Sequence, residues 1–396
     1  MSSAPVNFEC LEHKVSSMNF EFMATTVEGL EDLAAREIEG LGGRVNEAKR
    51  ARVFFEGLLD LMYRVNISAR CVHKLILVLG RGRARGLSEI YRFAKSIDYS
   101  EAVRLDQSFA VRTTRVGEHE YTSIDISAVV GQAIVDYFVE AKSARPRVDL
   151  KNPDVEIGVY VRDDEVVIGV NTTGESLHKR NYRVYDHPAA LKTTLAAGML
   201  MLSGWRGEGL LDPMCGGGTI TIEAALMARR FPPGFFRRHA AFTKLAFYDP
   251  KAHREELERA LEGANRESYE IYGFDISPKH VAGARLNASS AGVHDTISFG
   301  VRDATKRETY KGLDVRHVVV NPPYGIRQSR PKAIKDLYAK FLRALSDELG
   351  GATLTIIVGF WKAFESALGG VDCDVLDVRD VKHGDLPAKV YKIRLR

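Results

Sequence analysis

Cysteine is scarce in this sequence of 396 residues, which holds only four: Cys10, Cys71, Cys215 and Cys373. The four are scattered and form no Cys-x-x-Cys pair, so we expect neither a disulfide scaffold nor a metal site. The sequence also lacks any apolar run near the roughly 18 residues that a membrane-spanning helix requires. Its first residues, MSSAPVNFECLEHK, contain no apolar segment typical of a secretory signal. These absences indicate a soluble protein of a reducing compartment, and we expect a cytoplasmic location with no membrane partner.

A strong net charge is also absent, because the chain carries only +4, but its charged residues are unevenly spread. Residues 1–60 hold 6 Lys and Arg against 11 Asp and Glu, whereas residues 70–115 hold 10 against 4. The second block includes the alternating Arg81, Arg83 and Arg85 of LGRGRARGL. Basic clusters attract phosphate backbones, so these arginines are candidate nucleic-acid contacts. A solvated face beside a glycine-rich turn explains the same pattern.

Hydrophobic spacing divides the chain into three parts, and the first two have mixed α+β character. In residues 18–69, GLEDLAAREIEGLGG has apolar residues at helical spacing, and RVFFEG follows as a strand. In residues 70–176, the pattern predicts a strand at 108–115, a helix at 123–141 and then a hairpin that turns at Asp163. We therefore expect two α+β domains before the third part begins.

The third part, residues 177–396, has a different rhythm, in which strands and helices alternate at short spacing. Such alternation predicts the α/β class, with a mostly parallel sheet covered by helices on both faces. The aromatic, basic and proline-rich stretch FPPGFFRRHAAFTKLAFYDP (231–250) interrupts the alternation as an insertion. We expect this insertion near the edge of the sheet, as a loop that faces substrate.

Acidic and glycine-rich sequence follows three of the predicted strands. LLDPMCGGGT places Asp212 and three glycines between a strand and a helix, where the backbone of a doubly wound sheet approaches its ligand. YGFDIS ends its strand with Asp275, and VRDAT ends another with Asp303. The former is placed to accept hydrogen bonds from a ribose diol, and the latter to meet an adenine amine. Each acid alone is equally consistent with a helix cap, but together they indicate a ligand that contains a nucleoside.

The same glycine turn disfavours other ligand classes. It lacks the Gly-Lys-Ser/Thr ending of a loop that grips phosphates, which argues against nucleotide hydrolysis. It also lacks a regularly spaced Gly-x-Gly-x-x-Gly, which argues against a dinucleotide. The remaining alternative is a tight turn between strand and helix that binds nothing.

The stretch HVVVNPPYG begins as an apolar strand and ends with an amide, two prolines and an aromatic ring. The following proline restricts Asn321 to an extended conformation, and the two prolines offer free carbonyls but no N–H donors. The amide oxygen of Asn321 and the carbonyl of Pro322 therefore form a pair of acceptors for an exocyclic –NH2 group. The ring of Tyr324 is suited to stack on a flat base. The alternative is a Pro-Pro turn that only ends a strand.

DPMCGGGT and NPPYG resemble the S-adenosylmethionine-dependent methyltransferases of the Rossmann-like class that modify exocyclic amines, whose signature is Asn-Pro-Pro-Tyr. Upstream, the linker LHKRNYR (177–183) resembles the end of a THUMP domain, which is an RNA-binding module. Within this linker, Lys179, Arg180 and Arg183 either contact phosphate or cover the joint between domains. The resemblance covers about residues 20–396. It implies a Rossmann-like methyltransferase domain that follows ferredoxin-like and THUMP domains.

The resemblance also implies ligands and roles. It implies S-adenosylmethionine as the cofactor, tRNA or another structured RNA as the partner, and a monomer that does not act on DNA. The catalytic amine clamp falls on Asn321, Pro322 and Tyr324. The cofactor-binding positions fall on Asp212, Cys215, Gly216, Gly218, Thr219, Asp275, Ile276, Asp303, Ala304 and Asn321.

In arrangement, the chain looks most like the tRNA guanine-N2 methyltransferases that act on the acceptor stem at position 6. Methylation of position 10 of tRNA, or of a 23S rRNA guanine at N2, is the alternative within RNA. Asn-Pro-Pro-Tyr also permits DNA adenine N6 or protein glutamine as the substrate, but the RNA-type module argues against both. A third interpretation is an RNA-binding protein without catalysis, and the intact Asp212, Asp275 and Asn321 argue against it.

Overall fold

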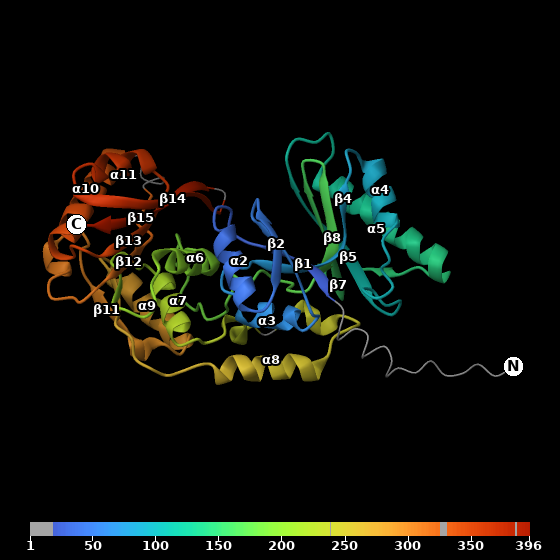
Figure 1. Ribbon diagram of the computed structural model, residues 1–396, viewed down its shortest axis with the longest axis horizontal. Coiled ribbons are helices and arrows are strands. Elements are labelled where there is room, and N and C mark those ends of the chain that lie inside the picture. Colours follow the sequence, from blue (N-terminus) through green and yellow to red (C-terminus); the bar gives the residue numbers. More distant parts are fainter. Residues whose placement is uncertain (1–18, 238, 325–330, 385) are drawn as a thin grey trace.

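The computed structural model describes residues 19–237, 239–324, 331–384 and 386–396, which form two sheets and the helices that cover them. Figure 1 shows the C-terminal sheet at one end of the molecule and the N-terminal sheet extending to the other. Residue 18, Cys10 and Gly325 of the NPPYG stretch lie outside the described residues. Within the described ranges, no helix combines the length and the apolar character that crossing a membrane requires.

Eight strands form the N-terminal sheet: β1 (Phe20–Thr25), β2 (Arg44–Lys49), β3 (Arg52–Gly57), β4 (Lys74–Arg83), β5 (Ser108–Val116), β6 (Arg147–Val148), β7 (Val155–Arg162) and β8 (Glu165–Asn171). The order is β2-β3-β1-β4-β8-β7-β5-β6, because β4 pairs antiparallel with β1 on one side and with β8 on the other. The two expected α+β units therefore share one continuous sheet. The predicted hairpin is confirmed, since β7 and β8 meet at Asp163, whose φ of 54° suits a tight turn.

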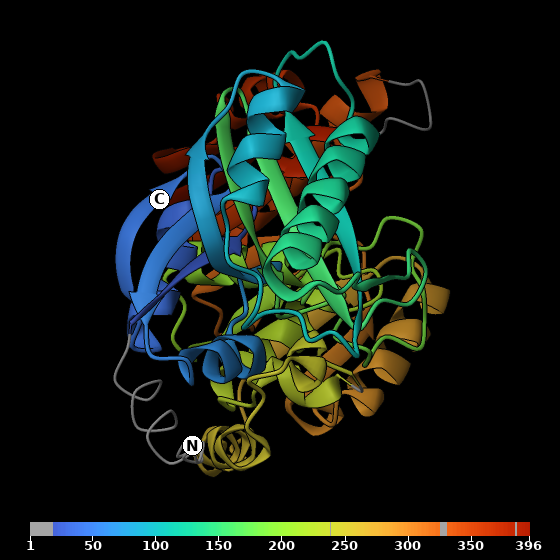
Figure 2. The ribbon, with the colours of Figure 1, turned by 90° about the vertical axis from the view of Figure 1, so that its right-hand side faces the viewer.

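Four helices cover this sheet: α2 (Glu31–Gly40), α3 (Leu61–Ser68), α4 (Leu87–Lys95) and α5 (Ser123–Lys142). Helix α5 begins at a capping box, in which Thr122 and Asp125 each accept a hydrogen bond from the other's backbone N–H group. Helices α4 and α5 pack side by side on one face of the sheet (Figure 2). The sequence predicts α2 and α5 but not α3 and α4, which have only 8 and 9 residues.

Seven strands form the C-terminal sheet: β9 (Leu210–Asp212), β10 (Ile271–Asp275), β11 (Ile297–Val301), β12 (His317–Val320), β13 (Thr353–Val358), β14 (Cys373–His383) and β15 (Leu386–Leu395). The order is β11-β10-β9-β12-β13-β15-β14. The prediction of a mostly parallel sheet is confirmed, since only the pairs made by β15 are antiparallel. Because β10 and β12 lie on opposite sides of β9, the chain order reverses there, and such switch points bind ligands in α/β sheets.

Helices cover both faces of the C-terminal sheet: α6 (Thr193–Ser203), α7 (Thr219–Ala228), α9 (Pro278–Ser290), α10 (Pro331–Glu348) and α11 (Trp361–Leu368), with the short 3-10 turns η3 (His294–Thr296) and η4 (Arg307–Thr309). Helix α8 (Pro250–Glu262) and the 3-10 turns η1 (Pro233–Phe236) and η2 (Ala241–Lys244) lie against the N-terminal module instead. Leu210 and Leu211 of β9 are both fully buried but belong to different core clusters, because successive side chains of a strand alternate. Residues of α6, α7 and α9 share the cluster of Leu210, and residues of α10 and α11 share that of Leu211.

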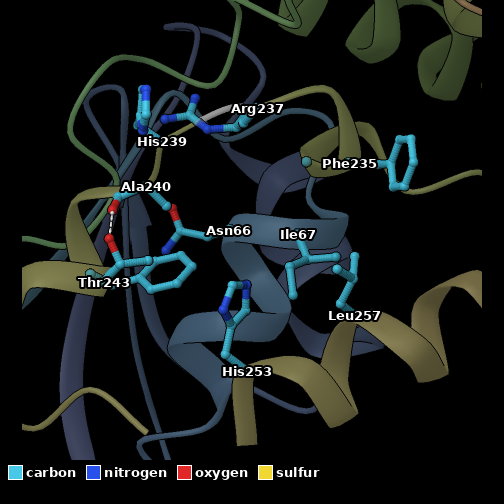
Figure 3. Close-up of a pocket in the computed structure, with 11 residues that line it drawn as sticks. Asn66, Ile67, Phe235, Arg237, His239, Ala240, Thr243, His253 and Leu257 are labelled. Carbon is cyan, nitrogen blue, oxygen red and sulfur yellow. Dashed lines mark hydrogen bonds between the residues drawn. The ribbon is translucent and has the colours of Figure 1, made fainter. Parts of the chain in front are cut away.

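The insertion at 231–250 packs on the N-terminal module, so its expected place at the edge of the C-terminal sheet is wrong. Phe242 and Leu245 are buried in the N-terminal core, and the ring of Phe242 lies edge-on to Tyr63 of α3 at 5.2 Å. Helix α8 continues the insertion and runs beneath α3 (Figure 1). Residues of α3, the insertion and α8 line an open hollow of about 180 Å³ (Figure 3). Its lining contains none of the candidate site residues.

Candidate active site

The predicted acids and Asn321 come together because they follow neighbouring parallel strands. Asp212 ends β9 and Asp275 ends β10, while Asn321 follows β12 on the other side of β9. Asp303 lies two residues beyond β11, the next strand outward. All four therefore lie at the carboxyl edge of the sheet, around its switch point.

The glycine turn is tied to the end of β10. The backbone N–H of Gly216 donates to Oδ2 of Asp275 at 2.9 Å, and Gly216 and Gly218 have φ angles of 51° and 81°. Such angles favour glycine, and a Cβ atom on Gly218 would come 3.1 Å from Cβ of Ala284. Gly218 is the N-cap of α7 and provides no side chain to cap it. The first N–H groups of this helix are therefore available to a ligand at the turn.

Cys215 and Thr219 form the inner wall of this turn. Cys215 is only 6% exposed, and burial raises the pKa of its thiol well above the usual value, which favours the protonated thiol over the thiolate. The hydroxyl of Thr219 accepts a hydrogen bond from Arg183 at 2.9 Å, and Arg183 also donates to the carbonyl of Leu191. Arg183 therefore braces the glycine turn from the linker.

The three acids differ in their surroundings. Asp212 is 2% exposed, and burial raises the pKa of its carboxyl well above the usual value, with a further increase from the neighbouring Asp275. Asp275 accepts a second backbone hydrogen bond, from the N–H of Ser277 at 2.9 Å. Burial alone would raise the pKa of Asp303, but hydrogen bonds from Thr305 outweigh it and leave that pKa below its usual value.

Two apolar side chains accompany these acids. Ile276 follows Asp275 and is 69% exposed, whereas Ala304 follows Asp303 and is buried. An exposed isoleucine beside a pair of acids offers one apolar face for a flat ring. That these two residues surround an adenine stays a prediction.

Asn321 carries an acceptor with no partner. Its Oδ1 atom is buried and makes no hydrogen bond within the part of the chain that the structure describes. A buried polar atom without a partner costs about 1–3 kcal/mol, which a donor on a ligand removes. The next residue, Pro322, is buried as well. The amide oxygen therefore fits the amine acceptor expected from the sequence.

The side chain of Tyr324 is half-buried and is held by two neighbours. Its ring lies against Gly359, and its hydroxyl lies 3.1 Å from Nδ1 of His383. Neither of these two neighbours was assigned a role from the sequence. The closing stretch HGDLPAKVYKIRL contains His383, but nothing in its local pattern indicates a contact 59 positions away along the chain.

A short segment after the linker covers the glycine turn and was also missed. The backbone N–H groups of Val184 and Tyr185 donate to Oδ1 of Asn287 in α9, whose Nδ2 donates to the carbonyl of Gly217. The ring of His187 lies 3.4 Å from the place where a Cβ of Gly216 would stand. The sequence did not show which residues cover the glycine turn, because these contacts join residues that lie far apart along the chain.

Several of the candidate RNA contacts pair with acidic side chains. The guanidinium of Arg81 pairs with Glu47 and Glu165 and lies 3.8 Å from the ring centroid of Phe54. Arg83 pairs with Asp164 and Lys179 with Glu175, but Arg83, Arg85 and Lys179 are all exposed to solvent.

Arg180 is 3% exposed and lies at the joint between the N-terminal module and α7. It donates to the carbonyls of Leu177 and Arg70, and its Nε lies 3.6 Å from Glu223. Arg70 donates in turn to the carbonyls of Leu226 and Phe231 at the end of α7. The sequence left two roles open for Arg180, a phosphate contact or a contact at the joint between domains, and its burial supports the second.

Comparison with known protein families covers most of the chain. The RMKL-like, methyltransferase domain matches residues 180–389, the THUMP domain matches 84–171, and the RlmL ferredoxin-like domain matches 21–76. The first of these matches alone spans more than half of the chain.

Curated relatives carry two kinds of name. The tRNA (guanine(6)-N2)-methyltransferase of Methanocaldococcus jannaschii is 38% identical, over 95% of this chain and all of the relative. The protein of the same name from Archaeoglobus fulgidus is 41% identical, over 94% of this chain and 92% of the relative. The ribosomal RNA large subunit methyltransferase K/L of Aliivibrio salmonicida is 34% identical over 85% of this chain, but the match covers only 48% of that protein.

Solved structures share the arrangement of all three domains. SMU.472, crystallised in complex with SAH, superposes with a TM-score of 0.84 at 25% identity, over 96% of this chain and 98% of that chain. TrmN from Thermus thermophilus superposes with a TM-score of 0.70 at 25% identity, over 95% of this chain and all of that chain.

Proposed function

Because the chain belongs to the RMKL-like methyltransferase family with a THUMP domain, we propose that it methylates the exocyclic N2 amine of a guanine in tRNA, at position 6. The observation that carries this proposal is the unpartnered Oδ1 of Asn321 at the switch point of the sheet. The relatives named for position 6 match along nearly their whole length, whereas the K/L relative matches along about half of its own. This difference favours tRNA over 23S rRNA.

The residues at the strand ends fit S-adenosylmethionine, whose use family membership and the likeness to a structure with SAH both imply. Gly216 and Gly218 would let the backbone approach the methionine part, and Asp275 would accept from the ribose diol. Asp303, Ile276 and Ala304 would surround the adenine. Bound there, S-adenosylmethionine supplies an electrophilic methyl group on a sulfonium.

The acceptors of the Asn-Pro-Pro-Tyr stretch act on the amine. The N2 lone pair of guanine is delocalised into the ring, which makes the amine a poor nucleophile. Hydrogen bonds from N2–H to Oδ1 of Asn321 and to the Pro322 carbonyl orient the lone pair and stabilise positive charge that develops on nitrogen. Attack by the amine would form the N–C bond as the S–C bond of the donor breaks, its electron pair would stay on sulfur, and the methylated amine would then lose a proton to water. No strong general base is needed, because the methylated amine is acidic before that loss.

Selection of the guanine belongs to the RNA module. A base in a stem reaches the pocket only after leaving its stack, so the THUMP region must hold the RNA at another place. The exposed Arg83, Arg85 and Lys179 are suited to phosphate contacts, and such contacts make binding weaken steeply with salt.

One experiment separates the candidate substrates. The purified protein is incubated with labelled S-adenosylmethionine and, separately, with tRNA, rRNA or DNA, and the products are digested and analysed by mass spectrometry. We expect N2-methylguanosine in tRNA alone, and tRNA from cells that lack the protein should lose this nucleoside at position 6. Incorporation of label into rRNA or DNA instead of tRNA, or loss of N2-methylguanosine at position 10 instead of position 6, would contradict the proposed substrate.

Replacing the amine acceptor tests the chemistry. Asn321→Ala should lower kcat by about 100-fold, since it removes an interaction that strengthens in the transition state. The Kd of S-adenosylhomocysteine, measured by calorimetry, should change little. Full turnover in this variant rules out the acceptor role of Asn321.

A further inference from the structure

Tyr324 is anchored by two residues outside the Asn-Pro-Pro-Tyr stretch. A Cβ atom on Gly359 would come 2.8 Å from Cδ2 of the Tyr324 ring, so the ring occupies the space that this glycine leaves. The Tyr324 hydroxyl lies 3.1 Å from Nδ1 of His383, and the two rings meet edge to face with centroids 5.6 Å apart. Gly359 follows β13 and His383 ends β14, so two elements hold one side chain.

The hydrogen bond between Tyr324 and His383 joins two neutral groups. Burial lowers the pKa of His383 below its usual value. The ring is therefore neutral at pH 7, with one nitrogen that donates and one that accepts. The phenol and the neutral imidazole each offer a donor and an acceptor, so the tautomer of His383 sets which of the two donates.

Strand β14, which carries His383, is anchored to the N-terminal module. Arg379 pairs with Asp32 of α2, and Val381 is buried in a core cluster that includes Val27 of the N-terminal module. Arg379, Val381 and His383 lie on one face of β14, since side chains of a strand alternate. The strand that carries His383 is thus docked on the N-terminal module.

We propose that His383 is a positioning residue for the methyl transfer: it holds Tyr324 and, through it, the acceptors of Asn321 and Pro322 in the orientation that the amine requires. The inference rests on the proposed function and adds a residue to its site. Two prolines leave the tetrapeptide few conformations, so fixing the side chain of Tyr324 also restricts Asn321 and Pro322. Orientation of the acceptors affects the transition state and leaves cofactor affinity unchanged.

A double-mutant cycle tests this role. His383→Leu should lower kcat for tRNA roughly tenfold, the scale of one lost hydrogen bond, without changing the Kd of S-adenosylhomocysteine. His383→Asn should recover most of the activity, because an amide oxygen can stand where Nδ1 stood. Tyr324→Phe should lose a similar factor, and combining it with His383→Leu should cost little more. Asp380→Asn, on the same strand and 88% exposed, is the control and should keep wild-type kcat.

The possible outcomes separate the positioning role from the proposed function. Unchanged kcat in His383→Leu, or losses that multiply in the double variant, overturns the positioning role and leaves the function standing. A wild-type protein that methylates no tRNA overturns both. Should His383→Leu fail to fold, the cycle is measured with His383→Asn and Tyr324→Phe instead. In that cycle, a kcat of Tyr324→Phe equal to that of the wild type shows that the hydrogen bond has no role in catalysis and overturns the proposal.

Discussion

Among single residues, Asp212 illustrates how the binding site lowers stability. Its carboxyl is buried and its pKa is raised, so the folded state binds a proton more tightly there than the unfolded chain does. This contribution to stability is therefore fully present below the ordinary pKa of an aspartate and is lost as pH rises from there through the raised pKa. An acid retained in such a place is consistent with a role toward a ligand.

Asp212→Asn should raise the Tm of the protein. The amide mimics the protonated acid without the cost of burying a charge, so at pH 8 we expect an increase of roughly 2–4 °C, and a smaller one at pH 5. Thermal unfolding at both pH values measures the difference. Asp303→Asn is the matched control, because the pKa of Asp303 is lowered and its replacement should reduce the Tm at pH 8. A lower Tm for Asp212→Asn at pH 8 contradicts this account.

At the scale of the elements, helix α7 connects the site with the N-terminal module. It begins at the glycine turn, where Arg183 bonds Thr219, and its last turn accepts hydrogen bonds from Arg70. Glu223 in its middle is fully buried beside Arg180. One helix thus carries contacts to both the glycine turn and the domain joint.

Arg180→Ala should destabilise the protein by about 3–5 kcal/mol, because it leaves the buried Glu223 without its nearest cation. Lys179→Ala, one residue earlier and paired with Glu175 in solvent, should change stability by less than about 0.5 kcal/mol. Urea denaturation of the two variants gives both values. Similar stability of the two variants would mean that the buried pair contributes little to stability. If Arg180→Ala folds but binds tRNA more weakly, Arg180 contacts phosphate after all.

Local pattern was sufficient to predict the hairpin of β7 and β8, the mostly parallel sheet and the positions of the acids at the ends of its strands, because each depends on a few neighbouring residues. The shared N-terminal sheet was not predictable, since the pairing of β4 with β8 joins residues about ninety positions apart. The insertion was misplaced for the same reason, because its aromatic residues suit any apolar surface. Within the site, Asn321 was predictable from its prolines, whereas His383 and Gly359 meet Tyr324 only through the fold.

For the whole molecule, the N-terminal module and the methyltransferase domain share a core. Val27, Leu30 and Leu33 from the first belong to the same buried cluster as Leu195 and Val381 from the second. A shared apolar interior ties the RNA module to the site at a fixed spacing. Such an arrangement suits an enzyme that finds its guanine by the shape of the RNA.

Thermal unfolding should therefore show a single cooperative transition, not one for each domain. Calorimetry of the full chain measures this as agreement between the calorimetric and van't Hoff enthalpies. Replacing Leu30 by Ala, which opens the shared core, should lower the Tm of the entire transition. Two resolved transitions in the wild type would contradict the shared core.

The path of the chain through the insertion has a consequence for biosynthesis. Phe242 and Leu245 complete the interior of the N-terminal module, yet they are made some seventy residues after its last strand, β8. While the ribosome is still translating that interval, the module has left the exit tunnel with an apolar gap beneath α3. Nascent chains of this protein should consequently engage a chaperone until the insertion emerges and closes the gap.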